Sequence, residues 1–225
     1  MMPPPDPSAS VTAVIINFNT RDLTRRAILS LHRYYSGLPL LIIDNGSRRE
    51  DAEALGELNH RSASPTTLLL NRRNVHHGPA MDQAIRRIGS PYALFLDSDC
   101  EITRPGFIEA MAGLLEERPE NYAVGHRIYM NKRGFDVPGP GGAFEYIRPY
   151  CMMIKRQLYL ELPPFRRHGA PCLENMRTAT GRGYALIDFP VGAYVNHEGR
   201  GTAGKFGYRL GFRGRINHLL NWVGL

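Results

Sequence analysis

Four short apolar segments in the first hundred residues constrain the fold more than any other feature of this chain. Their composition, rich in leucine, isoleucine and valine, is typical of buried strands, and they cover residues 11–17, 38–45, 66–71 and 92–97. Between them lie segments with apolar residues at helical spacing, at 20–35, 48–60 and 78–89. Because each connection is short, the pattern predicts a parallel, doubly wound α/β sheet.

The second half of the chain alternates less regularly. We expect helices over 105–118 and 171–180, strands over 122–130, 184–190 and 193–197, and a strand leading into a short helix over 146–162. A loop rich in glycine and proline covers 132–142, and loops of that length are often functional. These elements belong to the same domain as the first half, which we expect to span 11–200, as two halves, 11–102 and 103–200.

The two ends of the chain differ from this domain. Residues 1–10 contain several prolines and little to bury, so we expect a disordered lead-in. Residues 201–225 are basic and amphipathic, with an apolar helical face that includes Phe212, Ile216 and Leu219. Two interpretations of this tail stay open. In the first, the tail rests on an anionic membrane surface. In the second, residues 205–225 pack on the domain or on another subunit.

Composition limits the class of protein. The chain has 225 residues, of which 43% are apolar, enough for one sizeable core. Its formal charge of +7 suits an anionic partner, although it also promotes solubility. Three cysteines without metal-binding spacing predict neither a disulfide framework nor a zinc site. With no signal-peptide pattern and no apolar run of membrane-spanning length, we expect a cytoplasmic protein, or one peripheral to the inner face of a membrane.

Polar residues follow every predicted strand of the first half. They are Asn17-Phe18-Asn19, Asp44-Asn45-Gly46, Asn71 and Asp97-Ser98-Asp99. Any one of them is explained by turn chemistry, since Asn and Asp favour tight turns. In open α/β sheets, however, ligands bind at the carboxyl ends of the strands. Four such ends on one sheet edge therefore predict a binding site.

Asp97 and Asp99, one residue apart in "ALFLDSDCEI", allow a turn, a phosphatase nucleophile pair or a metal site. A turn after a strand lets both carboxylates reach one cation. Mg²⁺ and Mn²⁺ take carboxylate oxygens together with phosphate. The position after the fourth strand, with Asp44 ending the second, favours a metal site.

The segments "VTAVIINFNTRDLTRRAILSL", "LIIDNGSRRED", "NRRNVHHGPAMDQAI" and "YALFLDSDCEI" resemble, in order and spacing, the inverting family-2 glycosyltransferases of the GT-A fold. "FPVGAYVNHEG" resembles the closing strand of that family, with its histidine. The resemblance implies a GT-A domain whose half 11–102 binds a nucleotide sugar and whose half 103–200 shapes the acceptor side. It implies transfer of a sugar, with inversion, from a nucleotide-diphosphate sugar to an acceptor hydroxyl, assisted by Mn²⁺ or Mg²⁺.

The resemblance also implies roles for individual residues. It assigns the nucleotide sugar to Asn17, Phe18, Asn19, Asp44, Asn45, Asp82, Asp97 and Ser98. It assigns the metal to Asp97, Asp99 and His197. A UDP-sugar is the favoured donor. The acceptor stays open between a glycan, a lipid-linked and a small molecule, and we expect no nucleic-acid partner.

The sequence departs from the family pattern at the catalytic base. The family places an acidic pair at the start of a helix, but aligned back from Gly183 that pair falls on Pro171 and Cys172. Glu174 is the nearest acid and our expected base. Alternatively, it is an ordinary first-turn acid facing the helix dipole. A second departure is His76, where the family often has glycine.

Other functions share some of these features. A haloacid-dehalogenase-like phosphatase uses a strand-end Asp and a second one two residues on, but usually on its first strand. A nucleotidyltransferase also uses strand-end acids, but its first strand leads into a glycine-rich loop, where this chain has "NFNT". A degenerate, non-catalytic protein that binds a nucleotide sugar also remains open, because the acidic pair is missing.

Overall fold

We describe the protein from a computed structural model, which covers residues 9–61, 64–166 and 169–198. The predictions for the basic tail and for most of the lead-in lie outside these residues. Within the described part of the chain, none of the helices combines the length and the apolar character that a membrane span requires.

The first half forms the parallel sheet that the sequence predicts. Four parallel strands have the order β3-β2-β1-β4: β1 (Val11–Asn17), β2 (Leu40–Asp44), β3 (Thr66–Leu70) and β4 (Tyr92–Asp97). The connecting helices are α1 (Arg21–Tyr34), α2 (Arg49–Arg61) and α3 (His77–Arg87). The strand order reverses between β1 and β4, and such a switch point is where doubly wound sheets bind ligands.

The second half extends the sheet with antiparallel strands. Its elements are α4 (Phe107–Glu116), β6 (Asn121–Met130), β7 (Asp136–Val137), β8 (Phe144–Lys155), α5 (Arg156–Leu160), α6 (Leu173–Gly181) and β9 (Ala185–Asp188). β8 pairs antiparallel with β4 on one side and with β6 on the other, and β9 pairs parallel with β6. The short strand β7 lies inside the segment that we predicted to be a loop.

A small ribbon at the edge of the sheet was not predicted as a separate element. β5 (Cys100–Ile102) pairs antiparallel with β10 (Val195–His197), which follows the short 3₁₀ helix η2 (Val191–Ala193). In this pairing His197 is opposite Cys100, directly after Asp99. The ribbon therefore brings two segments about a hundred residues apart in the sequence to the same place.

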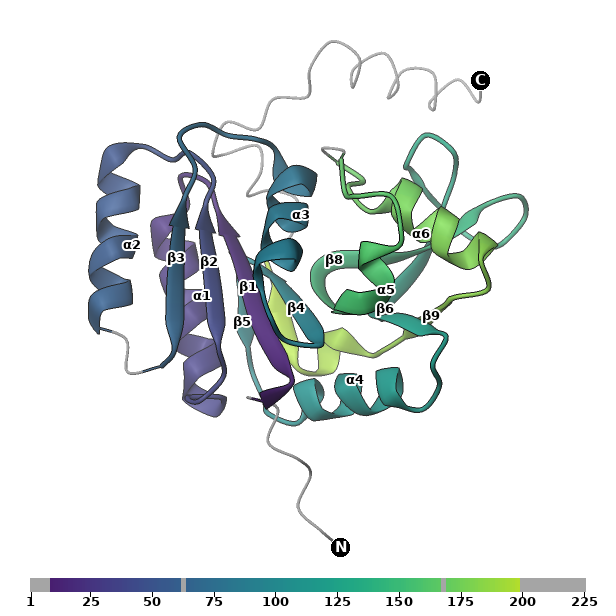
Figure 1. Ribbon diagram of the computed structural model, residues 1–225, viewed down its shortest axis with the longest axis horizontal. Coiled ribbons are helices and arrows are strands. Elements are labelled where there is room, and N and C mark those ends of the chain that lie inside the picture. The colour runs from purple at the N-terminus through teal and green to yellow at the C-terminus, as the bar shows by residue number, and fades with distance from the viewer. Residues whose placement is uncertain (1–8, 62–63, 167–168, 199–225) are drawn as a thin grey trace, which may run out of the picture.

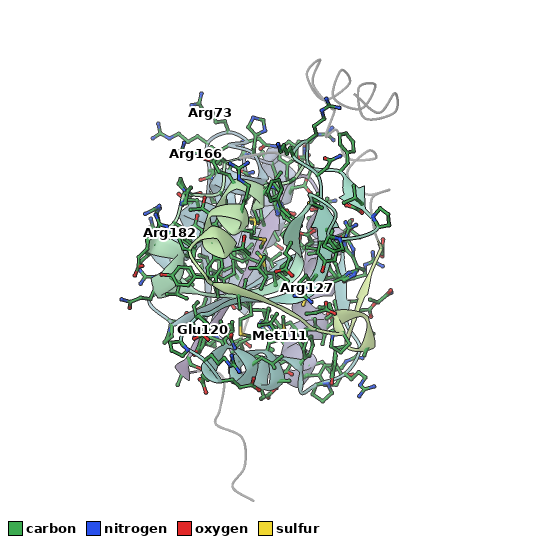
Figure 2. All side chains as sticks on the ribbon, turned by 90° about the vertical axis from the view of Figure 1, so that its right-hand side faces the viewer. Arg73, Met111, Glu120, Arg127, Arg166 and Arg182 are labelled. Atoms are coloured by element: carbon green, nitrogen blue, oxygen red, sulfur yellow. The ribbon has the colours of Figure 1, made fainter. Side chains whose placement is uncertain are left out.

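Buried side chains form two cores, one on each face of the sheet. One core packs the apolar sides of α1, α2 and α4 and the β5–β10 ribbon against the strands. The other packs α3, α5 and α6 against the opposite face. Figure 1 shows this arrangement, with α3 in front of the sheet and α1 behind it. In the view turned by 90°, Arg73, Arg166 and Arg182, all exposed, project from the surface (Figure 2).

Candidate active site

The strand register brings the predicted strand-end residues together. Asn17 at the end of β1 is aligned with Asp44 at the end of β2, and Asp97 at the end of β4 is aligned with Ile16. A hydrogen bond of 3.2 Å from the Thr20 hydroxyl to the Ser98 hydroxyl joins the loop after β1 to the loop after β4. The carboxyl edge of the sheet therefore carries one group of polar residues.

Asn17 is fully buried and its amide is engaged within the protein. Its Nδ2 donates to Asp44 Oδ1 at 2.8 Å and to Ser47 Oγ at 3.0 Å. Its Oδ1 accepts from the hydroxyls of Thr20 and Thr24. Two donors and two acceptor positions are all that an asparagine amide offers. The Asn17 side chain thus positions Asp44 and the neighbouring loops, and the contact of Asn17 with a nucleotide sugar stays a prediction.

Asn45 has a similar structural role for the loop between β3 and α3. Its Nδ2 donates to Asn74 Oδ1 and to the His76 carbonyl, and its Oδ1 accepts from Asn71 Nδ2 and from the Val75 backbone N–H. Since Asn45 is also fully buried, its side chain is committed to holding this loop against the end of β2. The loop ends at His76, directly before His77, the first residue of α3.

The turn after β1 presents Phe18 and Asn19 at the same edge, both half-buried. Asn19 has a φ of +57°, a left-handed conformation that asparagine adopts more readily than most residues. Its backbone N–H donates to Ser47 Oγ at 2.9 Å, and its Oδ1 accepts from the Arg48 backbone N–H. Asp44 accepts from Ser47 as well as from Asn17. The "NFNT" and "DNGS" turns therefore support each other.

Asp97, Asp99 and His197 converge beside this edge. His197 Nε2 lies 3.2 Å from Asp99 Oδ1 and 3.9 Å from Asp97 Oδ2. Burial raises the pKa of Asp97, and the charge of Asp99 raises it further, against the opposing effect of His77 and His197. Burial alone would lower the pKa of His197, but the hydrogen bond and charge of Asp99, with Asp97, raise it overall. Two adjacent carboxylates of this kind are an environment that a cation would stabilise.

The chemistry of the donor groups fits Mn²⁺ or Mg²⁺. Ligand atoms of Asp99, Cys100 and His197 lie within 4.8 Å of one another. The Cys100 thiol donates to the Tyr150 carbonyl, and burial raises its pKa well above the usual value, so it stays protonated and is a poor ligand. Carboxylate oxygens and an imidazole remain, a set that suits Mn²⁺.

His77 is a further residue at this site that the sequence analysis missed. It is the first residue of α3, and its Nε2 lies 3.6 Å from Asp97 Oδ1. Asp97 therefore lies between two imidazoles, of His77 and His197. The available signal was the position of "HH" between a strand end and the start of a helix, at the edge where the other site residues gather.

The adjacent His76 is held in a backbone conformation that ordinarily requires glycine. Its φ is +72° and its ψ is 166°, a combination that costs of order 1–3 kcal/mol for other residues. Its backbone N–H donates to Asn74 Oδ1, a contact that does not need the side chain. The hydrogen bonds between Asn45 and this loop, which we call the Asn45 clamp, therefore support a strained residue just before α3.

We expect His76→Gly to stabilise the protein by about 1 kcal/mol, because removing Cβ relieves the strain by more than glycine adds in unfolded-state entropy. Urea denaturation measures the change. His60→Gly in α2 is the matched control. That substitution should destabilise by about 0.5 kcal/mol, since His60 lies within a helix. Equal destabilisation by both variants would contradict the strain at His76.

The structure does not bring Asp82 and Glu174 into this group. Asp82 accepts a 2.6 Å hydrogen bond from the Tyr159 hydroxyl and pairs with Arg86 along α3. Glu174 is exposed in the first turn of α6. The preceding Cys172, where the acidic pair would fall, is fully buried. The expected base therefore lies on the helix that packs against the α3 face of the sheet.

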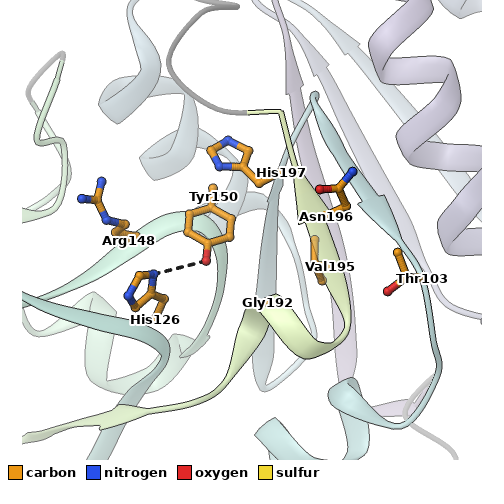
Figure 3. A pocket seen from close by; sticks show the side chains of 8 residues that line it. All are labelled: Thr103, His126, Arg148, Tyr150, Gly192, Val195, Asn196 and His197. Atoms are coloured by element: carbon orange, nitrogen blue, oxygen red, sulfur yellow. Dashed lines mark hydrogen bonds between the residues drawn. The ribbon is translucent and has the colours of Figure 1, made fainter.

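A cavity of about 480 Å³ lies beside the carboxylates. Its wall contains Thr103, His126, Arg148, Tyr150, Gly192, Val195, Asn196 and His197. Figure 3 shows these residues, with Tyr150 between His126 and His197. Arg148 and Tyr150 belong to the β8 segment that we expected on the acceptor side of the site.

The sequence profile described as "Glycosyl transferase family 2" matches residues 12–174, which is most of the chain. The chain belongs to glycosyl transferase family 2. The match includes the strand ends, the Asp97–Asp99 pair and Glu174. No significant sequence match to a protein of curated function was found.

Solved structures confirm the GT-A glycosyltransferase fold of this family-2 member. The mannosyltransferase PcManGT from Pyrobaculum calidifontis, in complex with GDP-Man and Mn²⁺, is 18% identical, with a TM-score of 0.61 over 83% of this chain and 56% of its own. GalNAc-T7 with UDP, GalNAc and Mn²⁺ is 14% identical, with a TM-score of 0.70 over 84% of this chain and 44% of its own.

TarS from S. aureus, in complex with UDP-GlcNAc, is 13% identical, with a TM-score of 0.57 over 85% of this chain and 60% of its own. This family-2 chain thus corresponds to about half of each of these structures. At these identities the likeness shows the fold, and the predicted α/β sheet with its mainly parallel first half is confirmed.

Proposed function

We propose that the protein is a metal-dependent, inverting glycosyltransferase that moves a sugar from a nucleotide-diphosphate sugar to an acceptor hydroxyl. The observation that carries this proposal is the convergence of Asp97, Asp99 and His197 at the carboxyl edge of the sheet, which also carries the buried Asp44 network. Membership of family 2 and the nucleotide-sugar complexes of its structural neighbours support it.

In this proposal the turns after β1 and β2 bind the nucleoside. Asp44 keeps acceptor capacity beyond its bonds to Asn17 and Ser47, and would accept from an N–H of the base. Phe18 and Asn19 would contact base and ribose, while Asn17 and Asn45 hold the turns in place. Asp97 and Ser98 would lie near the ribose. Asp82 would influence the donor pocket only indirectly, through its hydrogen bond with Tyr159. UDP is the favoured nucleotide, although the neighbours bind UDP or GDP sugars.

The residues that would hold the metal are Asp99 and His197, with Asp97 beside them. A bound divalent cation would neutralise the negative charge that grows on the departing diphosphate. His197 must be unprotonated at the nitrogen that binds a metal, and Nε2 is the ring nitrogen that faces Asp99. The acceptor hydroxyl would attack the sugar carbon opposite the leaving group, which inverts its configuration. A protein base would take the hydroxyl proton.

All three cysteines are free and buried, as expected for a protein in the reducing cytoplasm. We propose no nucleic-acid partner, and the acceptor stays open between a glycan, a lipid-linked and a small molecule. A membrane or subunit contact through 205–225 is a separate proposal, tested by liposome co-sedimentation of the chain with and without these residues.

A thermal-shift screen of UDP-, GDP- and dTDP-sugars, each with and without Mn²⁺, tests the proposal. A ligand at about one hundred times its Kd stabilises the native state by about 2.7 kcal/mol. For a domain of this size, that corresponds to roughly 5–10 °C in Tm. We expect one nucleotide class to produce this shift, and only in the presence of Mn²⁺.

Product analysis then separates transfer from binding. Release of nucleoside diphosphate from the stabilising donor would support the enzyme. Stabilisation without release, with any acceptor tried, would favour the degenerate binding protein, for which the buried Pro171–Cys172 pair is the structural argument. A screen in which no donor raises the Tm would contradict both.

A further inference from the structure

The proposed reaction needs a base beside the acceptor, and no residue of α6, which carries Glu174, lines the cavity that borders His197. The apolar residues of α6 belong to the core that contains α3 and α5. The β5–β10 ribbon and Tyr150 belong to the core on the opposite face. The cavity that borders His197 is on this second face. Glu174 is not among the residues that line it.

A row of three aromatic side chains forms one wall of this cavity. The rings of Tyr150 and His197 are stacked, with centroids 4.4 Å apart and planes at 2°. The Tyr150 hydroxyl lies 3.3 Å from His126 Nδ1, and the two rings meet edge to face (Figure 3). His197 in turn approaches Asp99 at 3.2 Å. The row therefore runs from the metal carboxylates to His126.

The cavity is open to solvent and large enough for a small molecule. Its volume of about 480 Å³ lies within the range of roughly 300–1,000 Å³ typical of such sites. Its wall contains the aromatic side chain of Tyr150 and polar groups of His126, Asn196 and Thr103. Because His197 lies in the same wall, a molecule in the cavity would be next to a sugar whose diphosphate is held at Asp99.

We propose that this cavity receives the acceptor, and that His126 takes the proton of the attacking hydroxyl. The inference rests on the proposed glycosyltransferase function and names a catalytic residue for it. His126 is exposed to the cavity on β6, one residue after Gly125. The register of β6 against β8 shifts between Gly125 and Arg127, so His126 occupies a bulge. Such irregularities often redirect a side chain toward a site.

The other ionisable groups of the wall are less suited to accept this proton. Arg148 is paired with Asp136 and stays protonated. Burial raises the pKa of Tyr150 to about 12, so its hydroxyl remains protonated at neutral pH. His197 faces Asp99 and the proposed metal. Asn196 and Thr103 offer no base. Among the residues that line the cavity, His126 is the remaining candidate.

The substrates and these residues account for every proton and electron pair that moves in the proposed step. In the tautomer with its proton on Nδ1, His126 donates to the Tyr150 oxygen, and Nε2 keeps its lone pair. The acceptor oxygen forms a bond to the sugar carbon as its proton moves to Nε2. The bond from that carbon to the diphosphate oxygen breaks, and its electron pair leaves with the nucleoside diphosphate. The imidazolium keeps its hydrogen bond to Tyr150 and later releases the proton to solvent.

His126→Ala should reduce release of nucleoside diphosphate roughly a hundredfold, the lower end of the effect of a general base. UDP-GlcNAc and GDP-mannose with Mn²⁺ are the probe donors, and water serves as the acceptor. The donor-induced thermal shift should be unchanged. Free imidazole should restore part of the lost rate in His126→Ala, relative to wild type with the same imidazole. His126→Gln, which retains a hydrogen-bond partner for Tyr150, should lose as much activity.

His60→Ala, at an exposed histidine on α2, is the control and should behave as wild type. Unchanged turnover in both His126 variants would overturn the inference, as would a loss that imidazole does not restore. A large loss of turnover in Glu174→Gln, with His126 variants that stay active, would assign the base to Glu174 and overturn the inference. If no donor of the thermal-shift screen binds to the wild type or is cleaved by it, the proposed function fails and this inference with it.

Discussion

Asp99→Ala should lower the release of nucleoside diphosphate by about 10²–10³-fold, because it removes a principal ligand of the cation that neutralises the leaving group. Asp99 Oδ1 also holds His197 at 3.2 Å, so the substitution disturbs a second ligand. The side chain of Asp99 is only 10% exposed, and its removal should not create a new surface. Steady-state turnover of the donor selected by the thermal-shift screen measures the loss.

Metal binding gives an independent readout for the same variant. We expect the Mn²⁺-dependent part of the donor-induced thermal shift to disappear in Asp99→Ala. Asp22→Ala is the matched control, because its carboxylate is 91% exposed in the first turn of α1. Chelation of the metal should reduce wild-type turnover to a similar extent. Transfer that survives in Asp99→Ala would show that the metal arrangement proposed here is wrong.

The sequence predicted the first half of the fold closely, because β1, β2 and β4 are buried, β3 at the edge is partly buried, and the helices have one apolar face. β1 and β4 begin and end where the apolar segments do. The strand ends then follow from topology, since parallel strands of a doubly wound sheet present their carboxyl ends to the same edge. For this reason the pattern of residues alone is enough to single out Asp44, Asp97 and Asp99.

The roles of individual amides at that edge were less predictable. Asn17, Asn19 and Asn45 all follow or end an apolar strand, and sequence alone does not distinguish a buried clamp from a ligand contact. The difference lies in partners distant in sequence. Asn17 needs Ser47 and Asp44 from the next strand end, and Asn45 needs Asn71 and Asn74 from the one after.

The wall of the cavity depends on pairing that a local pattern does not encode. β8 lies antiparallel between β4 and β6, with Cys151 opposite Leu96. That register places Tyr150 near the end of β4, where it meets His197 from the end of the described chain. No spacing in the sequence relates His126, Tyr150 and His197. Their neighbourhood follows from strand order in the second half, which the sequence left undetermined.

Gly46→Ala should destabilise the protein by about 3 kcal/mol or more, the largest stability effect that we expect from a single methyl group. Gly46 has a φ of +74°, and a non-glycine residue there costs about 1–2 kcal/mol. A Cβ would also lie 2.3 Å from the Arg73 carbonyl carbon and 2.5 Å from the Asn74 nitrogen. These are backbone atoms, which cannot rotate away as a side chain can, and overpacking adds about 1–3 kcal/mol.

The structural reason for this close approach is the Asn45 clamp, which pulls the loop before α3 onto the turn after β2. A Tm lower by roughly 6–12 °C is expected for a domain of this size. Gly56→Ala provides the matched control, because nothing lies within 4 Å of the added Cβ and the residue is inside α2. That variant should gain about 0.5–1 kcal/mol. If Gly46→Ala were as stable as wild type, the turn after β2 and the loop before α3 could not be packed as closely as the structure places them. The close packing of this loop would then not explain how the turn that holds Asp44 is supported.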